Sequence, residues 1–289
     1  MRRSLVIGVA AATLGMVACG NSSRPVGQIE SNETAGVAPD GTFDANAVID
    51  SAFEVATGQR GEKENAPGAL RVNNLLVRNG APIDIDVYWG LPDEGEKAAT
   101  VAFGQASDYL VPRRAKGAQD AVFTITVAGK VTEELMTWDR WSTSAAADRT
   151  TATFTFDGES VSMAMVDESP ATLDSATNEP MFPAATSGKV RLRWWVLGNS
   201  LNLGDALLSV TLGGKCLTNG SSWADLDGNA LFDVSTVEVP GGSQLGFAPT
   251  CDGAPVADVA VPANGRAILF AYSQPDGSPA LQLLPVTDS

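Results

Sequence analysis

The sequence contains no histidine. Imidazole is the commonest general base near neutral pH and the commonest transition-metal ligand in proteins. Its absence excludes Ser-His-Asp and Cys-His catalytic arrangements and zinc sites built with histidine. No other catalytic set of residues stands out in the sequence, which therefore predicts a protein without enzymatic activity.

Basic residues are few. The chain has 19 Lys and Arg against 34 Asp and Glu, which gives a formal net charge of -15. This excess of negative charge repels the phosphates of nucleic acids and the headgroups of anionic lipids. We therefore expect no nucleic-acid partner, and the composition fits a soluble protein exposed at a cell surface.

The apolar run near the amino terminus is too short to cross a membrane comfortably. Leu5 to Val17 carries no charge, but a transmembrane helix needs about 20 residues. The run follows Arg2-Arg3 and ends in the small residue Ala18, which is the order of a secretory signal. The sequence therefore predicts export, with residues 1–18 as the signal peptide.

A cysteine directly follows this signal. Met16-Val17-Ala18-Cys19 resembles the bacterial lipobox, which implies that Cys19 becomes an acylated (for example palmitoylated) amino terminus. Several acyl chains exceed what stable membrane anchoring requires. Gly20, rather than Asp, follows the cysteine, which fits the outer membrane if the cell has two membranes. The alternative is an ordinary signal peptide with a coincidental cysteine.

The remaining two of the 3 cysteines are Cys216 and Cys251. An even pair in an oxidising compartment favours a disulfide bond. It would close a loop of about 35 residues and stabilise the fold by about 3–4 kcal/mol. Two free buried thiols are the alternative.

Residues 19–67 are rich in Asn, Ser, Gly, Glu and Ala and poor in apolar side chains. Such a segment buries too little surface to offset its ordering entropy, so it predicts a flexible tether. One stretch differs from the rest. Asp44 to Val55 places Val48, Ile49, Ala52 and Phe53 on one helical face, which predicts a short helix before Gly58.

From Gly68 onward, apolar residues alternate with polar ones. Ile83–Trp89 places Asp84 and Asp86 on one face, where we expect solvated acids. Asp157-Gly158 predicts a hairpin between two further strands. Turns recur about every ten residues and no long amphipathic helix appears, so the sequence predicts an all-β fold of antiparallel β-sandwiches.

The second half repeats the rhythm of the first. Lys189–Val196, Ala206–Leu212 and Ser243–Ala248 follow the patterns of Ala69–Val77, Ile83–Trp89 and Ala121–Val127, and a closing hairpin turns at Pro275-Asp276-Gly277. We expect two tandem domains, residues 68–168 and 189–289. Residues 169–188, rich in Pro, Ala, Ser and Thr, are the expected linker.

Three segments of the first half carry a family resemblance: Leu70–Asn74, Gly80–Tyr88 and Phe103–Tyr109. They resemble the opening "R-V-x-N/H" strand, the "A-P-x-x-D-V-Y" strand and the "Y/F-G-x-A-S-x-Y" segment of the domain of unknown function 4397 family of bacterial envelopes. The second half keeps Val239-Pro240-Gly241-Gly242-Ser243. The resemblance implies exported, immunoglobulin-like domains, often in tandem, and it implies no activity.

Two groups of residues are candidate ligand sites. Asp225, Asp227, Asn229 and Asp233 alternate acidic oxygens around Gly228, a pattern that can bind Ca²⁺; an acidic turn is the alternative. Trp194 and Trp195 are neighbours on a strand and face opposite ways, so one of them can stack on a sugar rather than pack in the core. Otherwise we expect no cofactor.

Three arginines, Arg71, Arg191 and Arg193, lie on the outward faces of the opening strands of the two halves. We expect them to pair with the excess of acids.

Two functions fit these features. The first is a non-catalytic binding or structural module of the bacterial envelope, lipid-anchored on the extracytoplasmic side, whose partner is an envelope protein or a glycan. The second is a calcium-stabilised or carbohydrate-capturing lipoprotein that serves a transport or degradative system. Fold alone does not choose between them.

Overall fold

The computed structural model describes residues 61–90, 92, 96–118, 121–130, 135–141, 149–156, 161–169, 180, 182–197, 209–213, 215–216, 231–248 and 253–287. All regular secondary structure in these ranges is β-strand, as the sequence predicts. A search of the same residues finds no helix suited to crossing a membrane. The signal peptide and the helix expected at Asp44–Val55 lie outside them.

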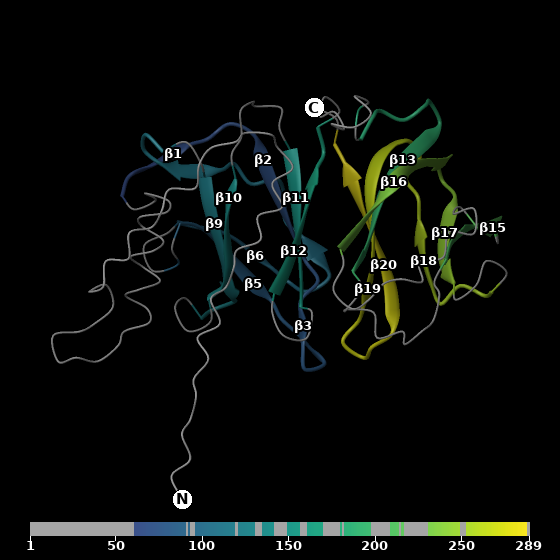
Figure 1. Ribbon diagram of the computed structural model, residues 1–289, viewed down its shortest axis with the longest axis horizontal. Helices are drawn as coiled ribbons and strands as arrows, with labels where there is room; N and C mark the ends of the chain where they lie inside the picture. Colours follow the sequence, from purple (N-terminus) through teal and green to yellow (C-terminus); the bar gives the residue numbers. More distant parts are fainter. Residues whose placement is uncertain are drawn as a thin grey trace, which may run out of the picture. The chain divides into compact units, whose positions relative to one another are not determined.

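The first half of the fold contains two four-stranded sheets (Figure 1). One has the order β12-β11-β2-β7 and the other β10-β9-β5-β6. The strands are β2 (Ala69–Asn74), β5 (Ile85–Trp89), β6 (Glu96–Val101), β7 (Gln105–Ala106), β9 (Ala121–Val127), β10 (Leu135–Trp141), β11 (Arg149–Phe156) and β12 (Val161–Asp167).

The second half also contains two four-stranded sheets, with the orders β16-β13-β19-β20 and β15-β14-β17-β18. The strands are β13 (Lys189–Leu197), β14 (Ser209–Leu212), β15 (Lys215–Cys216), β16 (Leu231–Pro240), β17 (Gln244–Ala248), β18 (Ala257–Ala260), β19 (Gly265–Ser273) and β20 (Pro279–Val286).

The two halves have the same strand order. In each, the opening strand lies between the penultimate strand and a partner from the middle of the half. The opening strand runs parallel to the penultimate one: β2 pairs with β11, and β13 pairs with β19. The other pairs are antiparallel, as predicted. The parallel pair is not predicted, because it joins strands about 80 residues apart and no local pattern sets it.

Alternating apolar residues bury one face of each sheet. In the first half, Leu70, Val72, Phe123 and Phe154 are among the buried residues of a core between the two sheets. The Phe123 ring packs edge-on against Trp89 and Phe154, with centroids 6.4 and 6.1 Å apart. The second half has an equivalent core that includes Leu192, Leu245, Phe247 and Leu269. Each half is therefore a β-sandwich.

A third apolar cluster joins the halves, both of which lie in one compact unit, Ile49–Ser289. It combines Leu75 and Val166 of the first half with Ile268 and Phe270 of the second. Phe182, fully buried, belongs to it too. Phe182 lies within residues 169–188, the expected linker, so this segment adds a buried aromatic side chain to the contact between the halves.

The expected tether also ends earlier than predicted. β1 (Lys63–Asn65) pairs with β8 (Arg113–Ala115), and Ala66 is buried in the first core. Opposite charges support this pairing, because Glu64 faces Arg114 at 3.0 Å and Glu62 faces Lys116 at 3.0 Å. Residues 63–66 therefore belong to the fold, because β1 pairs with β8, Glu64 forms an ion pair with Arg114, and Ala66 is buried in the core.

Turns fall where small and polar residues allow them. β11 and β12 form the hairpin predicted around Asp157-Gly158, and β19 and β20 turn at Pro275–Gly277, where Gly277 has φ 81°. A further hairpin joins β3 (Val77–Arg78) to β4 (Ala81–Pro82). Its turn is Asn79-Gly80, with φ 54° and 71°, which is the turn that this dipeptide favours.

Candidate functional site: a buried polar junction

A row of polar side chains lies on the face of β2 and β11 that points away from the first core. Leu70 and Val72 of β2 enter that core, so Arg71 and Asn73 point the other way. The parallel pairing sets Arg71 opposite Thr151 and Asn73 opposite Thr153. All four side chains are buried, which identifies a covered polar face instead of a solvated one.

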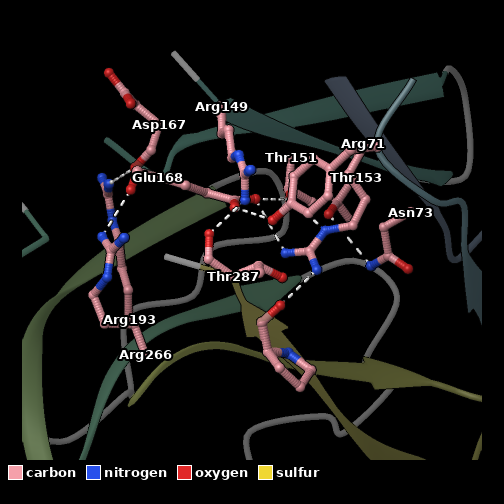
Figure 2. Close-up of polar contacts among 12 residues, drawn as sticks. Arg71, Asn73, Arg149, Thr151, Thr153, Asp167, Glu168, Arg193, Arg266 and Thr287 are labelled. Atoms are coloured by element: carbon pink, nitrogen blue, oxygen red, sulfur yellow. Dashed lines mark hydrogen bonds and ion pairs between the residues drawn. The ribbon is translucent and has the colours of Figure 1, made fainter. Parts of the chain in front are cut away.

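Glu168, just after β12, is the centre of this face (Figure 2). Its side chain has no exposed surface. One carboxylate oxygen accepts from Arg71 Nη2 at 3.0 Å and from the Thr151 hydroxyl, and the other accepts from the Tyr109 hydroxyl. Arg71 Nε also donates to Thr151 Oγ1 at 2.9 Å. The carboxylate is thus enclosed by the protein's own donors.

Two guanidinium groups lie over the Tyr109 ring. The Cζ atoms of Arg71 and Arg149 are each 4.9 Å from its centroid, within the range of cation–π attraction. Burial, and then the hydrogen bond to Glu168, raises the pKa of Tyr109 from 10.0 to about 12. Tyr109 therefore stays protonated at neutral pH and acts as a donor.

The same residues cross to the second half. Arg71 Nη1 donates to the Pro285 carbonyl at 2.7 Å, and Asn73 Nδ2 donates to Gln282 Oε1 at 2.8 Å. Arg149 donates to the Thr287 carbonyl. In the opposite direction, Gln282 Nε2 donates to the Gly104 carbonyl at 3.0 Å. These bonds connect β2, β11 and the β6–β7 loop to β20 and its end.

Two arginines of the second half hold the end of β12 (Figure 2). Arg266 Nη1 donates to the carbonyls of Glu168 and Phe182, at 2.7 and 2.9 Å. Arg193 Nη1 donates to the Asp167 carbonyl at 3.3 Å. The Arg266 Cζ also lies 5.0 Å from the Phe182 ring centroid. We give the name polar junction to this group of residues: Arg71, Asn73, Tyr109, Arg149, Thr151, Thr153, Glu168, Arg193, Arg266 and Gln282.

The polar junction is suited to holding two sheets together. Its carboxylate is enclosed, its tyrosine keeps its proton, and its arginines donate to acceptors of the same chain. One residue of the third apolar cluster, Phe182, lies against Arg266 of the junction. A buried ion pair with all of its hydrogen bonds made contributes fixed geometry, because removing either partner leaves a buried charge unpaired.

Stability should fall in alkali partly through Tyr109. Because the pKa of Tyr109 in the folded protein is about 12, the unfolded chain loses the phenolic proton first. The stabilisation is present below pH about 10 and disappears as the pH rises toward about 12. Tyr109→Phe should be less stable than the wild type by about 1.5 kcal/mol at pH 8. Urea unfolding from pH 8 to 11.5 should show this difference shrinking; a constant difference would contradict the assignment.

Two of the three arginines that were expected to pair with acidic residues do so. Arg71 pairs with Glu168, and Arg191 pairs with Glu238 at 2.6 Å, as expected. Hydrogen bonds from Thr186, then the charges of Arg191 and Lys189, lower the pKa of Glu238 from 4.5 to about 2. The bond of Arg193 given above goes to a backbone carbonyl.

The prediction of solvated acids on β5 is wrong for Asp86, which is 1% exposed. Lys97 and Thr100 bind its Oδ1 at 2.7 and 2.6 Å, and the Gly129 N–H donates to Oδ2 at 2.8 Å. Burial raises the pKa of Asp86, but these bonds outweigh it and the pKa is lowered. Asp84 is exposed and accepts from the Phe103 N–H.

Most of the other predicted site residues cannot be compared. Cys19, Cys251, Asp225, Asp227 and Asn229 lie outside the described residues, so lipidation, the disulfide and the calcium site stay predictions. Cys216 ends β15, Asp233 lies in β16, and Trp194 and Trp195 lie in β13 with Trp195 opposite Asp233. Within the described ranges, no three Cys, Asp or Glu residues gather as metal ligands.

No protein-family model and no curated protein matches the chain. One similar solved structure is the fimbrial anchor protein Mfa2 from Porphyromonas gingivalis, with 10% identity over 77% of this chain and 100% of that chain, and a TM-score of 0.16. The fold is defined by this chain's own strands and cores.

Proposed function

We propose that this chain is a lipid-anchored, non-catalytic module of a bacterial cell envelope. The observation that carries the proposal is the run from Met1 to Cys19, in which a positive segment, an uncharged apolar stretch and Met16-Val17-Ala18-Cys19 follow in order. The lipid on Cys19 attaches the protein to the membrane. The β-sandwiches then act on the extracytoplasmic side.

The way in which the buried ionic side chains are paired supports the proposal that the module is non-catalytic. The buried ionic groups Arg71, Glu168 and Asp86 are bound by groups of the same chain. These side chains therefore stabilise the fold. Two β-sandwiches joined by a shared apolar cluster are suited to present a surface to an envelope protein or a glycan.

Lipidation is tested in a bacterium that makes the full-length chain and is fed an alkyne-tagged fatty acid. The wild-type protein should carry the tag and sediment with membranes. Cys19→Ser should lose the tag and appear in the soluble fraction. Cys216→Ser is the matched control and should keep both the tag and the membrane fraction. A tagged Cys19→Ser variant, or an untagged wild type, would overturn the anchor.

The partner is tested separately, by cross-linking intact cells and identifying the linked molecules by mass spectrometry. A single envelope protein linked repeatedly to the sandwiches would support a binding module. Recovery of glycan alone would identify the carbohydrate as partner. If the only links lie within this chain or between copies of it, the protein is a structural component.

A further inference from the structure

The two halves meet through the same sheet of each sandwich. In the first half this sheet is β12-β11-β2-β7, whose outer face carries Arg71 and Asn73. In the second half it is β16-β13-β19-β20, whose outer face contributes Ile268 and Phe270 to the cluster between the halves. In strand order, β2 corresponds to β13, β11 to β19 and β12 to β20. The contact therefore joins two equivalent faces.

The hydrogen bonds across this contact are reciprocal. In each half, an arginine on the opening strand and an arginine on the penultimate strand donate to carbonyls at the end of the other half's last strand. The four bonds run from Arg71 of β2 to Pro285, from Arg149 of β11 to Thr287, from Arg193 of β13 to Asp167 and from Arg266 of β19 to Glu168. A two-fold axis between identical subunits produces this pattern, because each partner then offers the same surface.

The chain crosses from one half to the other at a single point of this contact. Arg266 Nη1 donates to the carbonyls of both Glu168 and Phe182, at 2.7 and 2.9 Å. The residues on either side of 169–181 are thus brought together on one guanidinium group. Both residues are buried, Glu168 in the polar junction and Phe182 in the apolar cluster. The contact therefore has bonds that align its two faces independently of the covalent link.

The contact has the composition of a permanent protein–protein interface. Its centre is apolar and includes Leu75 of the first half and Phe270 of the second. Phe103 of the first half packs edge-on against Tyr272 of the second, with ring centroids 6.2 Å apart. Polar groups beside this centre bind across the contact, as described above. An apolar centre combined with paired polar groups is typical of the interfaces that join lasting partners.

We propose that this contact is an interaction surface in its own right, whose partner is a second β-sandwich that presents the equivalent face. The first half binds the second half without needing the peptide connection at 169–181. It also accepts the second half of another copy of this chain. The covalent link raises the effective concentration of the partner, so in an intact chain the two halves bind each other.

A cut in the connection tests this surface. A recognition site for a sequence-specific protease is inserted between Asp174 and Ser175 of the full-length chain. After complete cleavage, the two fragments should stay together at micromolar concentration, with the mass of the uncut chain in native mass spectrometry. The cut protein is then mixed with an isotope-labelled cut copy, in urea too dilute to reduce the β-sheet circular dichroism. Hybrid complexes of one labelled and one unlabelled fragment should form, whereas uncut chains should form none.

Two matched variants of the cut protein identify the surface that holds the fragments. Gln282→Ala removes two bonds across the contact, one from Asn73 Nδ2 at 2.8 Å and one to the Gly104 carbonyl at 3.0 Å. It should speed the formation of hybrids at least about tenfold, because lost interface bonds act mainly on dissociation. Gln244→Ala removes a bond within the second half, to Asp258 at 3.0 Å, and should exchange at the wild-type rate.

Separation of the fragments directly after the cut, with the β-sheet circular dichroism intact, would overturn the proposal. Loss of that signal on cutting would overturn it too, because the surface would then depend on the covalent link. If the fragments stay together but never form hybrids, the second half of another copy is not accepted. Equal exchange rates in the wild type and both variants would show that a different surface holds the halves.

Discussion

Replacing Glu168 by alanine is expected to lower the free energy of unfolding by about 3–5 kcal/mol. The change removes the acceptor of Arg71, Thr151 and Tyr109 at once. The side chain of Arg71 is 8% exposed, so its charge would stay buried without an anionic partner. Urea unfolding at pH 7, followed by tryptophan fluorescence, measures the loss.

Two further variants distinguish the loss of the carboxylate that pairs with Arg71 from a general loss of packing. Arg71→Met combined with Glu168→Leu removes both charges and should recover much of the stability, because an apolar pair of similar size carries no desolvation cost. Glu62→Ala removes a partner of Lys116 from a pair whose side chains are 73% and 66% exposed, and should cost less than about 1 kcal/mol. A Glu168→Ala effect as small as that of Glu62→Ala would disprove the importance of the junction.

The all-β fold could be predicted from the sequence because core-facing positions obey a local rule. Leu70 and Val72 alternate with polar residues, and the hydrophobic effect alone is enough to place them in the core. The same rule predicts that Arg71, Asn73, Thr151 and Thr153 are solvated, and here it fails. Polar side chains can be buried when they bind one another. The polar junction joins residues up to 214 positions apart, so no local pattern indicates it.

One signal of the covered faces was present in the sequence. Ala267–Tyr272 of β19 is an unbroken apolar run, and β20 is apolar at most positions. Near-continuous apolar strands are buried on both faces. Leu269 enters the second core, whereas Ile268 and Phe270 enter the cluster between the halves. Such a run in a sandwich strand indicates a second contact, although it does not identify the partner sheet.

The segment Val239-Pro240-Gly241-Gly242-Ser243 is part of the family resemblance seen in the sequence. The structure gives a physical reason for its first glycine. A Cβ atom on Gly241 would lie 1.7 Å from the Ala263 carbonyl oxygen and 2.4 Å from its carbonyl carbon. The Gly241 N–H is already bonded to the Gly188 carbonyl at 3.0 Å, and the Gly242 N–H to the Pro262 carbonyl at 2.9 Å. The turn between β16 and β17 is thus held close to the loop before β19.

Gly241→Ala is therefore expected to destabilise the protein by at least about 3 kcal/mol, at the upper end for overpacked sites, because backbone has to move. Gly242→Ala is the neighbouring control. Gly242 has φ 73° with open space around its Cβ position, so only the left-handed conformation is penalised, by about 1–2 kcal/mol. Thermal unfolding by circular dichroism should rank the wild type first, Gly242→Ala second and Gly241→Ala last. If both variants lose equal stability, the close approach of Ala263 is not what requires glycine, and the left-handed turn alone accounts for the motif.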